Sequence, residues 1–264
     1  MQTIVTTSHK PDPCSVAIGR WAAEVLNSEF IDRSRMSLED LKIKHNAENI
    51  IVVANGDMKL YSPRGEYFFH PSMSVPRIKA IKQGKSDHMI AAMALKPGDS
   101  VLDCTLGLGS DAIVASFAAG TEGLVTGIEA VPELALIVKH GMANYQSESQ
   151  ALKSAMERIR VECALYEQYL TGIPDLAFDI VYFDPMFRHP RLKSSSMEPL
   201  RGIVKYDPLS PKAVKDALRV ARKRVVMKEN NFSQEFARLG FSTVIGGRYS
   251  PVAFGIIEKQ EAGL

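Results

Sequence analysis

The stretch VLDCTLGLGSD, residues 101–111, is the strongest indication of the fold class that this chain adopts. The apolar run Ser100–Cys104 is typical of a buried strand, and Asp111–Ala119 has the composition of a helix. Between them, Gly107 and Gly109 allow positive φ angles and let a ligand approach the backbone closely. A strand, a glycine turn and a helix in this order predict the first βα unit of a doubly wound parallel sheet.

The alternation of strands and helices continues beyond this unit. Strands are expected at 124–129, 160–163, 179–183 and 224–228, helices at 132–145, 149–158 and 210–222, and a closing hairpin at 241–246 and 253–258. This order predicts an α/β fold with a mostly parallel sheet covered by helices on both faces. Ligands of such sheets bind at the carboxyl ends of the strands, so the residues that follow each strand are the candidates for chemistry.

The first part of the chain has a different pattern and is expected to form a small α/β module. Asn55-Gly56 predicts a hairpin turn between two short strands, and Ser37 with Asp40 predicts a helix-capping box. Trp21 is expected in the core of this module. Pro71 and Pro76 predict a linker, so the expected domains are a module at 1–75 and a ligand-binding domain at 76–264.

Composition limits the class of protein. The chain has 264 residues, of which 45% are hydrophobic, which is enough for one large domain with a smaller one attached. Its three scattered cysteines show no metal-ligand spacing, so we expect neither disulfides nor a metal. Without a signal-peptide pattern or a long apolar run, we expect a cytoplasmic protein with no membrane partner. The net charge of +2 permits a polyanionic partner without requiring one.

Acidic residues end the first two expected strands of the larger domain. Asp103 is placed to bind an amine or a hydroxyl group. Glu129 follows the glycine turn by about 20 residues, the spacing at which a carboxylate accepts the hydroxyls of a ribose. Gly107, Gly109 and Ala112 also satisfy the dinucleotide fingerprint G-x-G-x-x-A, so these features leave both an adenosyl ligand and a nicotinamide dinucleotide open.

The stretch FDIVYFDPMF, residues 178–187, favours the adenosyl ligand. Amino-group methyltransferases place Asp/Asn-Pro-Pro-Tyr/Phe at the end of this strand. A base amine becomes nucleophilic when its N–H groups donate to a carboxylate and a backbone carbonyl. Asp184 supplies the carboxylate, Pro185 fixes φ near about −65° and so rigidifies the carbonyl, and Phe187 offers a face on which a base can stack. We therefore predict Asp184, Pro185 and Phe187 as catalytic residues.

These motifs resemble the small-subunit rRNA methyltransferase J family, which methylates the N2 amine of a guanine in 16S rRNA. The similarity is strongest at 101–116, at 180–187 and at 223–228, and the tetrad Asp-Pro-Met-Phe is specific to that family. The resemblance implies a Rossmann-like methyltransferase with S-adenosyl-L-methionine as cofactor and RNA, as 16S rRNA or the small ribosomal subunit, as partner. Together with Asp103, Gly107 and Gly109, it gives the expected cofactor contacts Ser110, Asp111, Glu129, Ala130, Ala164, Leu165 and Asp184.

Three alternatives remain open at the level of the sequence. One is a methyltransferase for another substrate, such as DNA or a small molecule. The second is an NAD-dependent oxidoreductase, which the glycine fingerprint permits. The third is a non-catalytic RNA-binding module with the same fold. The basic stretch Arg188–Lys205 is either a phosphate contact or a solvated loop, and Lys228 is expected at a strand end on the side of the ligand.

Overall fold

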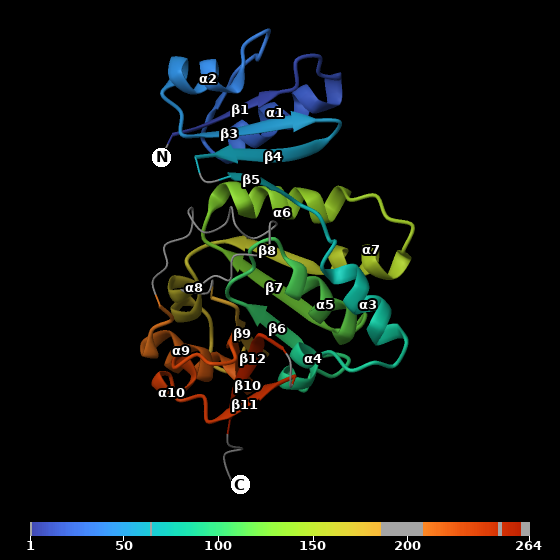
Figure 1. Cartoon of the computed structure of the whole chain (residues 1–264), viewed down its shortest axis with the longest axis vertical. Coiled ribbons are helices and arrows are strands. Elements are labelled where there is room, and N and C mark those ends of the chain that lie inside the picture. Colours follow the sequence, from blue (N-terminus) through green and yellow to red (C-terminus); the bar gives the residue numbers. More distant parts are fainter. Residues whose placement is uncertain (1, 64, 186–207, 248–249, 260–264) are drawn as a thin grey trace. The chain divides into compact units, whose positions relative to one another are not determined.

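The computed structural model describes residues 2–63, 65–185, 208–247 and 250–259 (Figure 1). The contacts between Cα atoms divide the chain into two units. The first unit holds the N-terminal 70 residues and Val131–Asn144, and the second holds Pro71–Ala130 and the described residues after Asn144. This grouping does not test which segments fold on their own, so domains at 1–75 and 76–264 stay a prediction.

A five-stranded sheet forms the centre of the first unit. Its strands are β1 (Thr3–Thr7), β2 (Glu29–Phe30), β3 (Asn49–Ala54), β4 (Asp57–Ser62) and β5 (Gly65–Phe68), in the order β2-β1-β3-β4-β5. Strand β1 runs parallel to β2 and β3, whereas β3, β4 and β5 are antiparallel. The helices are α1 (Pro13–Val25), α2 (Leu38–His45) and α6 (Pro132–Asn144), which lies against β4 and β5.

The expected turn and cap of this unit are confirmed, but the position of Trp21 is wrong. Ser37 and Asp40 form the capping box of α2, and Asn55-Gly56 joins β3 to β4. Small residues form the buried face of α1: a Cβ at Gly19 would lie 2.6 Å from the Phe30 ring. Trp21 is not among these buried residues and is 43% exposed.

A seven-stranded sheet forms the centre of the second unit. Its strands are β6 (Ser100–Asp103), β7 (Leu124–Glu129), β8 (Ile159–Cys163), β9 (Phe178–Phe183), β10 (Ala221–Asn230), β11 (Thr243–Gly246) and β12 (Val252–Glu258). Their order is β11-β12-β10-β9-β6-β7-β8, with β8, β7, β6, β9 and β10 parallel and β12 antiparallel to both β10 and β11. The expected doubly wound, mostly parallel sheet and its closing hairpin are confirmed, and the chain order reverses between β6 and β9.

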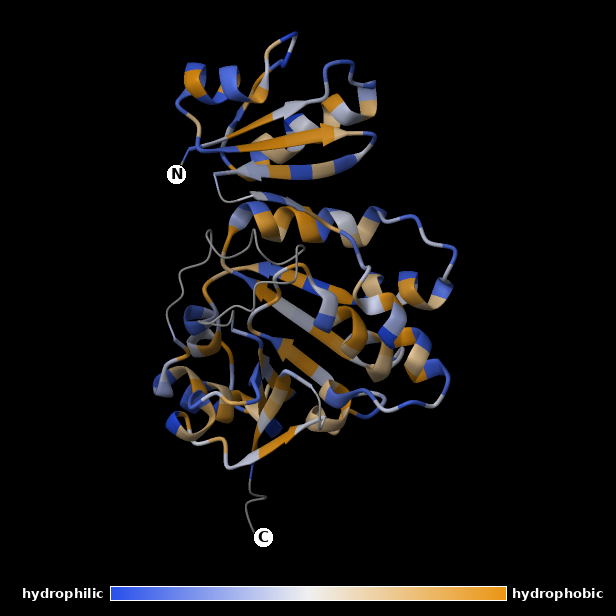
Figure 2. Cartoon of the chain, viewed as in Figure 1, coloured by the Kyte–Doolittle hydropathy of each residue, from blue (hydrophilic) through white to orange (hydrophobic). Residues whose placement is uncertain are grey.

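Helices cover both faces of this sheet, as its apolar strands require (Figure 2). They are α3 (Ser74–Lys82), α4 (His88–Met93), α5 (Ser110–Ala119), α7 (Gln150–Glu157), α8 (Tyr166–Gly172), α9 (Pro211–Val220) and α10 (Glu235–Arg238). Leu102, Val181 and Met227 face the core shared with α8, α9 and α10. Alternate residues of the same strands therefore face the side of α3, α4 and α5.

The linker expected between Pro71 and Pro76 is wrong, because α3 begins at Ser74. Pro76 lies in the first turn of this helix, where the missing N–H costs no hydrogen bond. No helix in the described part of the chain is long and apolar enough to cross a membrane.

Candidate active site

Three carboxylates predicted from the sequence lie at adjacent strand ends. Asp103 ends β6, Glu129 ends β7, and Asp184 directly follows β9. Strand β6 is hydrogen-bonded to β7 on one side and to β9 on the other. The three residues therefore share the carboxyl edge of the sheet, at the place where such folds bind ligands.

The glycine turn after β6 packs against the end of β7. Gly107 and Gly109 have φ angles of 52° and 79°, in the left-handed region that favours glycine. The Gly107 N–H donates to Glu129 Oε2 at 3.1 Å, and Glu129 is only 6% exposed. At Gly127, a Cβ would lie 2.4 Å from Leu106 Cδ1, so a glycine in β7 is what lets the turn approach this strand.

Asp103 is a buried carboxyl group with an altered ionisation. Its Oδ1 accepts the Thr105 N–H at 3.0 Å, and the residue is 2% exposed. Burial, with the nearby charges of Asp111 and Asp184, raises the pKa of Asp103 to about 8. The carboxyl group is therefore mainly protonated at neutral pH and can donate as well as accept a hydrogen bond.

Asp111 accepts hydrogen bonds from three side chains. It lies in the first turn of α5, where a carboxylate also suits the helix dipole. Its Oδ2 accepts the Tyr182 hydroxyl at 2.8 Å and the Lys228 Nζ at 2.9 Å, and its Oδ1 accepts Arg77 Nη1 at 2.5 Å. Burial alone would raise the pKa of Asp111, but Lys228 and Arg77 outweigh it and hold that pKa below its usual value.

Arg77 extends this network away from the strand ends. Its Nε and Nη2 donate to the two carboxylate oxygens of Asp87 at 2.7 and 2.9 Å. Asp87 is the N-cap of α4 and accepts the N–H groups of Met89 and Ile90. One guanidinium group thus connects α3, the start of α4 and the start of α5.

Asp184 is held at its backbone and at its side chain. Its N–H donates to Thr105 Oγ1 at 2.6 Å, and its Oδ2 accepts the Lys228 Nζ at 2.6 Å. Burial raises the pKa of Asp184, and Lys228 opposes that rise only in part. Pro185 follows and is half-buried. Phe187 and the stretch Arg188–Lys205 lie outside the described residues.

The remaining predicted residues lie around these carboxylates. Ser110 begins α5, and its carbonyl accepts the Ser74 hydroxyl at 3.1 Å. Ala164 donates its N–H to the Glu129 carbonyl at 3.0 Å, which places the turn after β8 beside the end of β7. Leu165 directly precedes α8 and is 49% exposed, and Ala130 is exposed after β7.

The sequence missed several members of the network. Arg77, Asp87, Thr105 and Tyr182 were not expected there. Tyr182 could have been found, because residues two apart in a strand share a face and Asp184 is two positions later. Arg77 and Asp87 gave no such signal, since only the tertiary fold brings them to α5.

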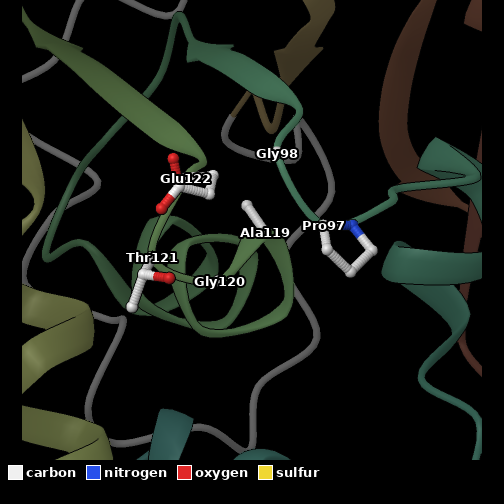
Figure 3. Close-up of a pocket in the computed structure, with 6 residues that line it drawn as sticks. All are labelled: Pro97, Gly98, Ala119, Gly120, Thr121 and Glu122. Atoms are coloured by element: carbon white, nitrogen blue, oxygen red, sulfur yellow. The ribbon is translucent and has the colours of Figure 1, made fainter.

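A pocket at the amino ends of the strands lies apart from the active-site residues described above. It has a volume of about 230 Å³ and is lined by Pro97, Gly98, Ala119, Gly120, Thr121 and Glu122 (Figure 3). These residues precede β6 and β7 and so lie at the amino ends of the strands. Within the described ranges, no group of three or more His, Cys, Asp or Glu side chains is arranged to hold a metal ion.

Comparison with known proteins adds an independent line of evidence. Residues 39–249 match the model of a family described as "Putative SAM-dependent methyltransferase". The Bacillus subtilis protein YpiP is 35% identical over 258 residues, which cover 97% of this chain and 100% of YpiP. A solved SAM-dependent methyltransferase from Neisseria gonorrhoeae superposes with a TM-score of 0.66 at 16% identity, covering 99% of this chain and 98% of that one. At this identity, the likeness shows the fold alone.

Relatives with a named substrate match over a shorter length. The ribosomal RNA small subunit methyltransferase J of Coxiella burnetii (strain Dugway 5J108-111) is 34% identical over 151 residues, covering 55% of this chain and 56% of that protein. The protein of the same name from Shewanella baltica (strain OS185) is 30% identical over 169 residues, covering 61% of this chain and 66% of that protein. The match thus spans between about half and two thirds of these relatives.

Proposed function

We propose a substrate for this chain, which belongs to the family of S-adenosylmethionine-dependent methyltransferases and takes S-adenosylmethionine as its cofactor. The proposed reaction methylates an exocyclic amine of a nucleobase, and guanine N2 of 16S rRNA is the candidate to test first. The observation that carries the proposal is Asp184-Pro185 at the end of β9, with both the backbone and the carboxylate of Asp184 fixed. The named methyltransferase J relatives support RNA as the substrate.

The residues at the strand ends fit the cofactor. Glu129 presents a buried carboxylate beside the Gly107 N–H, a combination suited to the hydroxyls of a ribose. The glycines of the turn leave the backbone open to a close ligand. The ionised carboxylate of Asp111 suits the positive charges of the methionine part, and the protonated carboxyl group of Asp103 can donate a hydrogen bond to that part. We therefore assign Glu129, the glycine turn and the start of α5 to cofactor binding.

The chain's own residues would align the acceptor. When bound, S-adenosylmethionine would supply a methyl group on a sulfonium: a C–N bond forms, the C–S bond breaks with its electrons passing to sulfur, and one proton passes from the nitrogen to water. Asp184 accepts an N–H of the amine, and the carbonyl at Pro185 accepts the second. Two acceptors fix the direction of the nitrogen lone pair, and alignment of this kind lowers the barrier of a reaction between two bound molecules.

The alternatives differ in what they predict. The dinucleotide fingerprint alone permitted an oxidoreductase, but the family and its cofactor argue against that chemistry. DNA and small molecules remain as other methyl acceptors, and a small molecule would need no basic stretch after the tetrad. The stretch Arg188–Lys205 carries five Lys or Arg and one acidic residue, which favours a phosphate backbone.

The test compares rRNA from cells with and without this protein. Mass mapping of modified nucleotides should find one methylated base that is absent from the deletion strain. Purified protein with labelled S-adenosylmethionine should methylate this base in rRNA from the deletion strain. It should transfer no labelled methyl group to rRNA from the parent strain, where the base is already methylated. Duplex DNA of matched length serves as the second acceptor. Identical rRNA maps in the two strains, or faster labelling of DNA, would contradict the proposal.

A further inference from the structure

One lysine ammonium joins carboxylates from two different elements of the active site. Met227 of β10 pairs with Phe183, the last residue of β9. Lys228 follows Met227 and Asp184 follows Phe183, so the two residues are neighbours across the strands. The Lys228 Nζ donates to Asp184 Oδ2 at 2.6 Å and to Asp111 Oδ2 at 2.9 Å. The three side chains are between 12% and 25% exposed, so water screens these ion pairs only weakly.

The carboxylates of Asp111 and Asp184 differ in the number of side chains that donate hydrogen bonds to them. Asp111 is also bonded to Arg77 of α3 and Tyr182 of β9, which makes it a fixed point. The side chain of Asp184 has Lys228 as its one hydrogen-bond donor in the part of the chain that the structure describes. No group of the described residues donates to its Oδ1, although the Asp111 carboxyl group lies close to that of Asp184. Lys228 thus connects a fixed carboxylate to the one that our proposed function assigns to the acceptor amine.

We propose that Lys228 is a positioning residue, which holds Asp184 Oδ2 so that Asp184 Oδ1 is aimed at the acceptor amine. This inference rests on the proposed function for the identity of the acceptor. Lys228 also offsets the repulsion between the neighbouring carboxylates of Asp111 and Asp184. Without the ammonium, one of them would take up a proton, and a protonated Asp184 would be a weaker acceptor for an N–H group.

The groups around Asp184 predict a shift in its titration. Among the described residues, those facing it are Lys228 of β10, Asp111 of α5, Asp103 of β6 and Tyr182 of β9. Burial raises the pKa of Asp184, Asp111 adds to this, and Lys228 is the cation that lowers it. Burial keeps the pKa of Tyr182 well above its usual value, so its hydroxyl stays neutral. Without Lys228, burial and the charge of Asp111 would still raise the pKa of Asp184, and the cation that lowers it would be gone.

The matched control lies on the same strand. Lys223 of β10 is paired with Asp99 at 2.5 Å and with Asp179 at 3.4 Å, near the amino ends of β6 and β9. The experiment compares Lys228→Met, Lys228→Arg and Lys223→Met by single-turnover methyl transfer to RNA as a function of pH, beside titration with S-adenosylhomocysteine. Lys223→Met should behave as the unmodified protein in both measurements.

We expect Lys228→Met to move the acid limb of the rate profile up by about one pH unit or more. Its rate should fall about 10- to 100-fold through misalignment, with affinity for S-adenosylhomocysteine changed only a few fold. Lys228→Arg should restore the position of the acid limb. If the profile of Lys228→Met matches that of Lys223→Met, the positioning role is wrong. If transfer and S-adenosylhomocysteine binding are lost in parallel and Lys228→Arg restores neither, Lys228 is a cofactor ligand instead.

A second measurement needs neither cofactor nor RNA. Carbon-13 NMR of the aspartate carboxyl groups follows the titration of Asp184 in the cofactor-free protein, with Asp184→Asn identifying the signal. The midpoint should lie at higher pH in Lys228→Met than in the unmodified protein, and an unchanged midpoint would overturn the inference. Lys228→Gln, which keeps a donor without the charge, replaces Lys228→Met if that variant does not fold. If the unmodified protein transfers no methyl group to RNA, the proposed function fails, while this titration still decides the role of Lys228.

Discussion

At the scale of single residues, the site combines side chains that could be predicted from the sequence with others that could not. Asp103, Glu129 and Asp184 each end or follow an apolar run, so strand periodicity alone predicted that they would share one edge of the sheet. Arg77 has no such signal, because its contact with Asp111 depends on how α3 packs against α5. The first prediction concerns Glu129, whose buried carboxylate should bind the ribose. Glu129→Ala should weaken S-adenosylhomocysteine binding by about 1.5–3 kcal/mol, the value of hydrogen bonds to a charged group. The control is Glu258→Ala, which removes an exposed side chain of β12 that pairs with Arg224 of β10. This variant should bind S-adenosylhomocysteine as the unmodified protein does. Calorimetry that finds equal affinities for the two variants would remove Glu129 from the cofactor site.

At the scale of elements, segments with a clear period or a turn or capping-box signal were predictable, and some short helices were not. The strand Leu124–Glu129 was expected with its observed ends, whereas α4 and α8 are too short to show a helical period and were missed. Helix α4 depends on its cap, because Asp87 both accepts two of its N–H groups and pairs with Arg77. Asp87→Ala should therefore destabilise the second unit by about 1 kcal/mol for the cap and by about 1.5–3 kcal/mol more for the bonds to Arg77. Ser210→Ala removes an N-cap from α9 without an ion pair and should cost only about 1 kcal/mol. Urea unfolding of the two variants measures the difference. Equal losses would mean that the ion pair of Asp87 contributes nothing to stability.

At the scale of the whole molecule, the carboxyl groups gathered for the reaction give folding a dependence on pH. The folded pKa of Asp103 is raised to about 8 from an ordinary value of 3.8, so the folded chain binds this proton more tightly than the unfolded chain does. Its contribution to stability is therefore complete at low pH and falls as the pH rises from about 4 to about 8. Asp111 acts in the opposite direction, because its lowered pKa gives stability that is lost only when the pH falls below the usual range of a carboxyl group. Between pH 5 and pH 8 the Asp103 effect remains, and Asp103→Asn removes it while keeping an oxygen that can accept the Thr105 N–H. The melting temperature of the unmodified protein should therefore fall more over this interval than that of Asp103→Asn. The value for Asp103→Asn minus the value for the unmodified protein should increase as the pH rises. Differential scanning calorimetry at several pH values in one ionic strength measures this difference. Parallel curves for the two proteins would show that Asp103 is already ionised in the folded state, and its role as a neutral donor beside the cofactor would then be withdrawn.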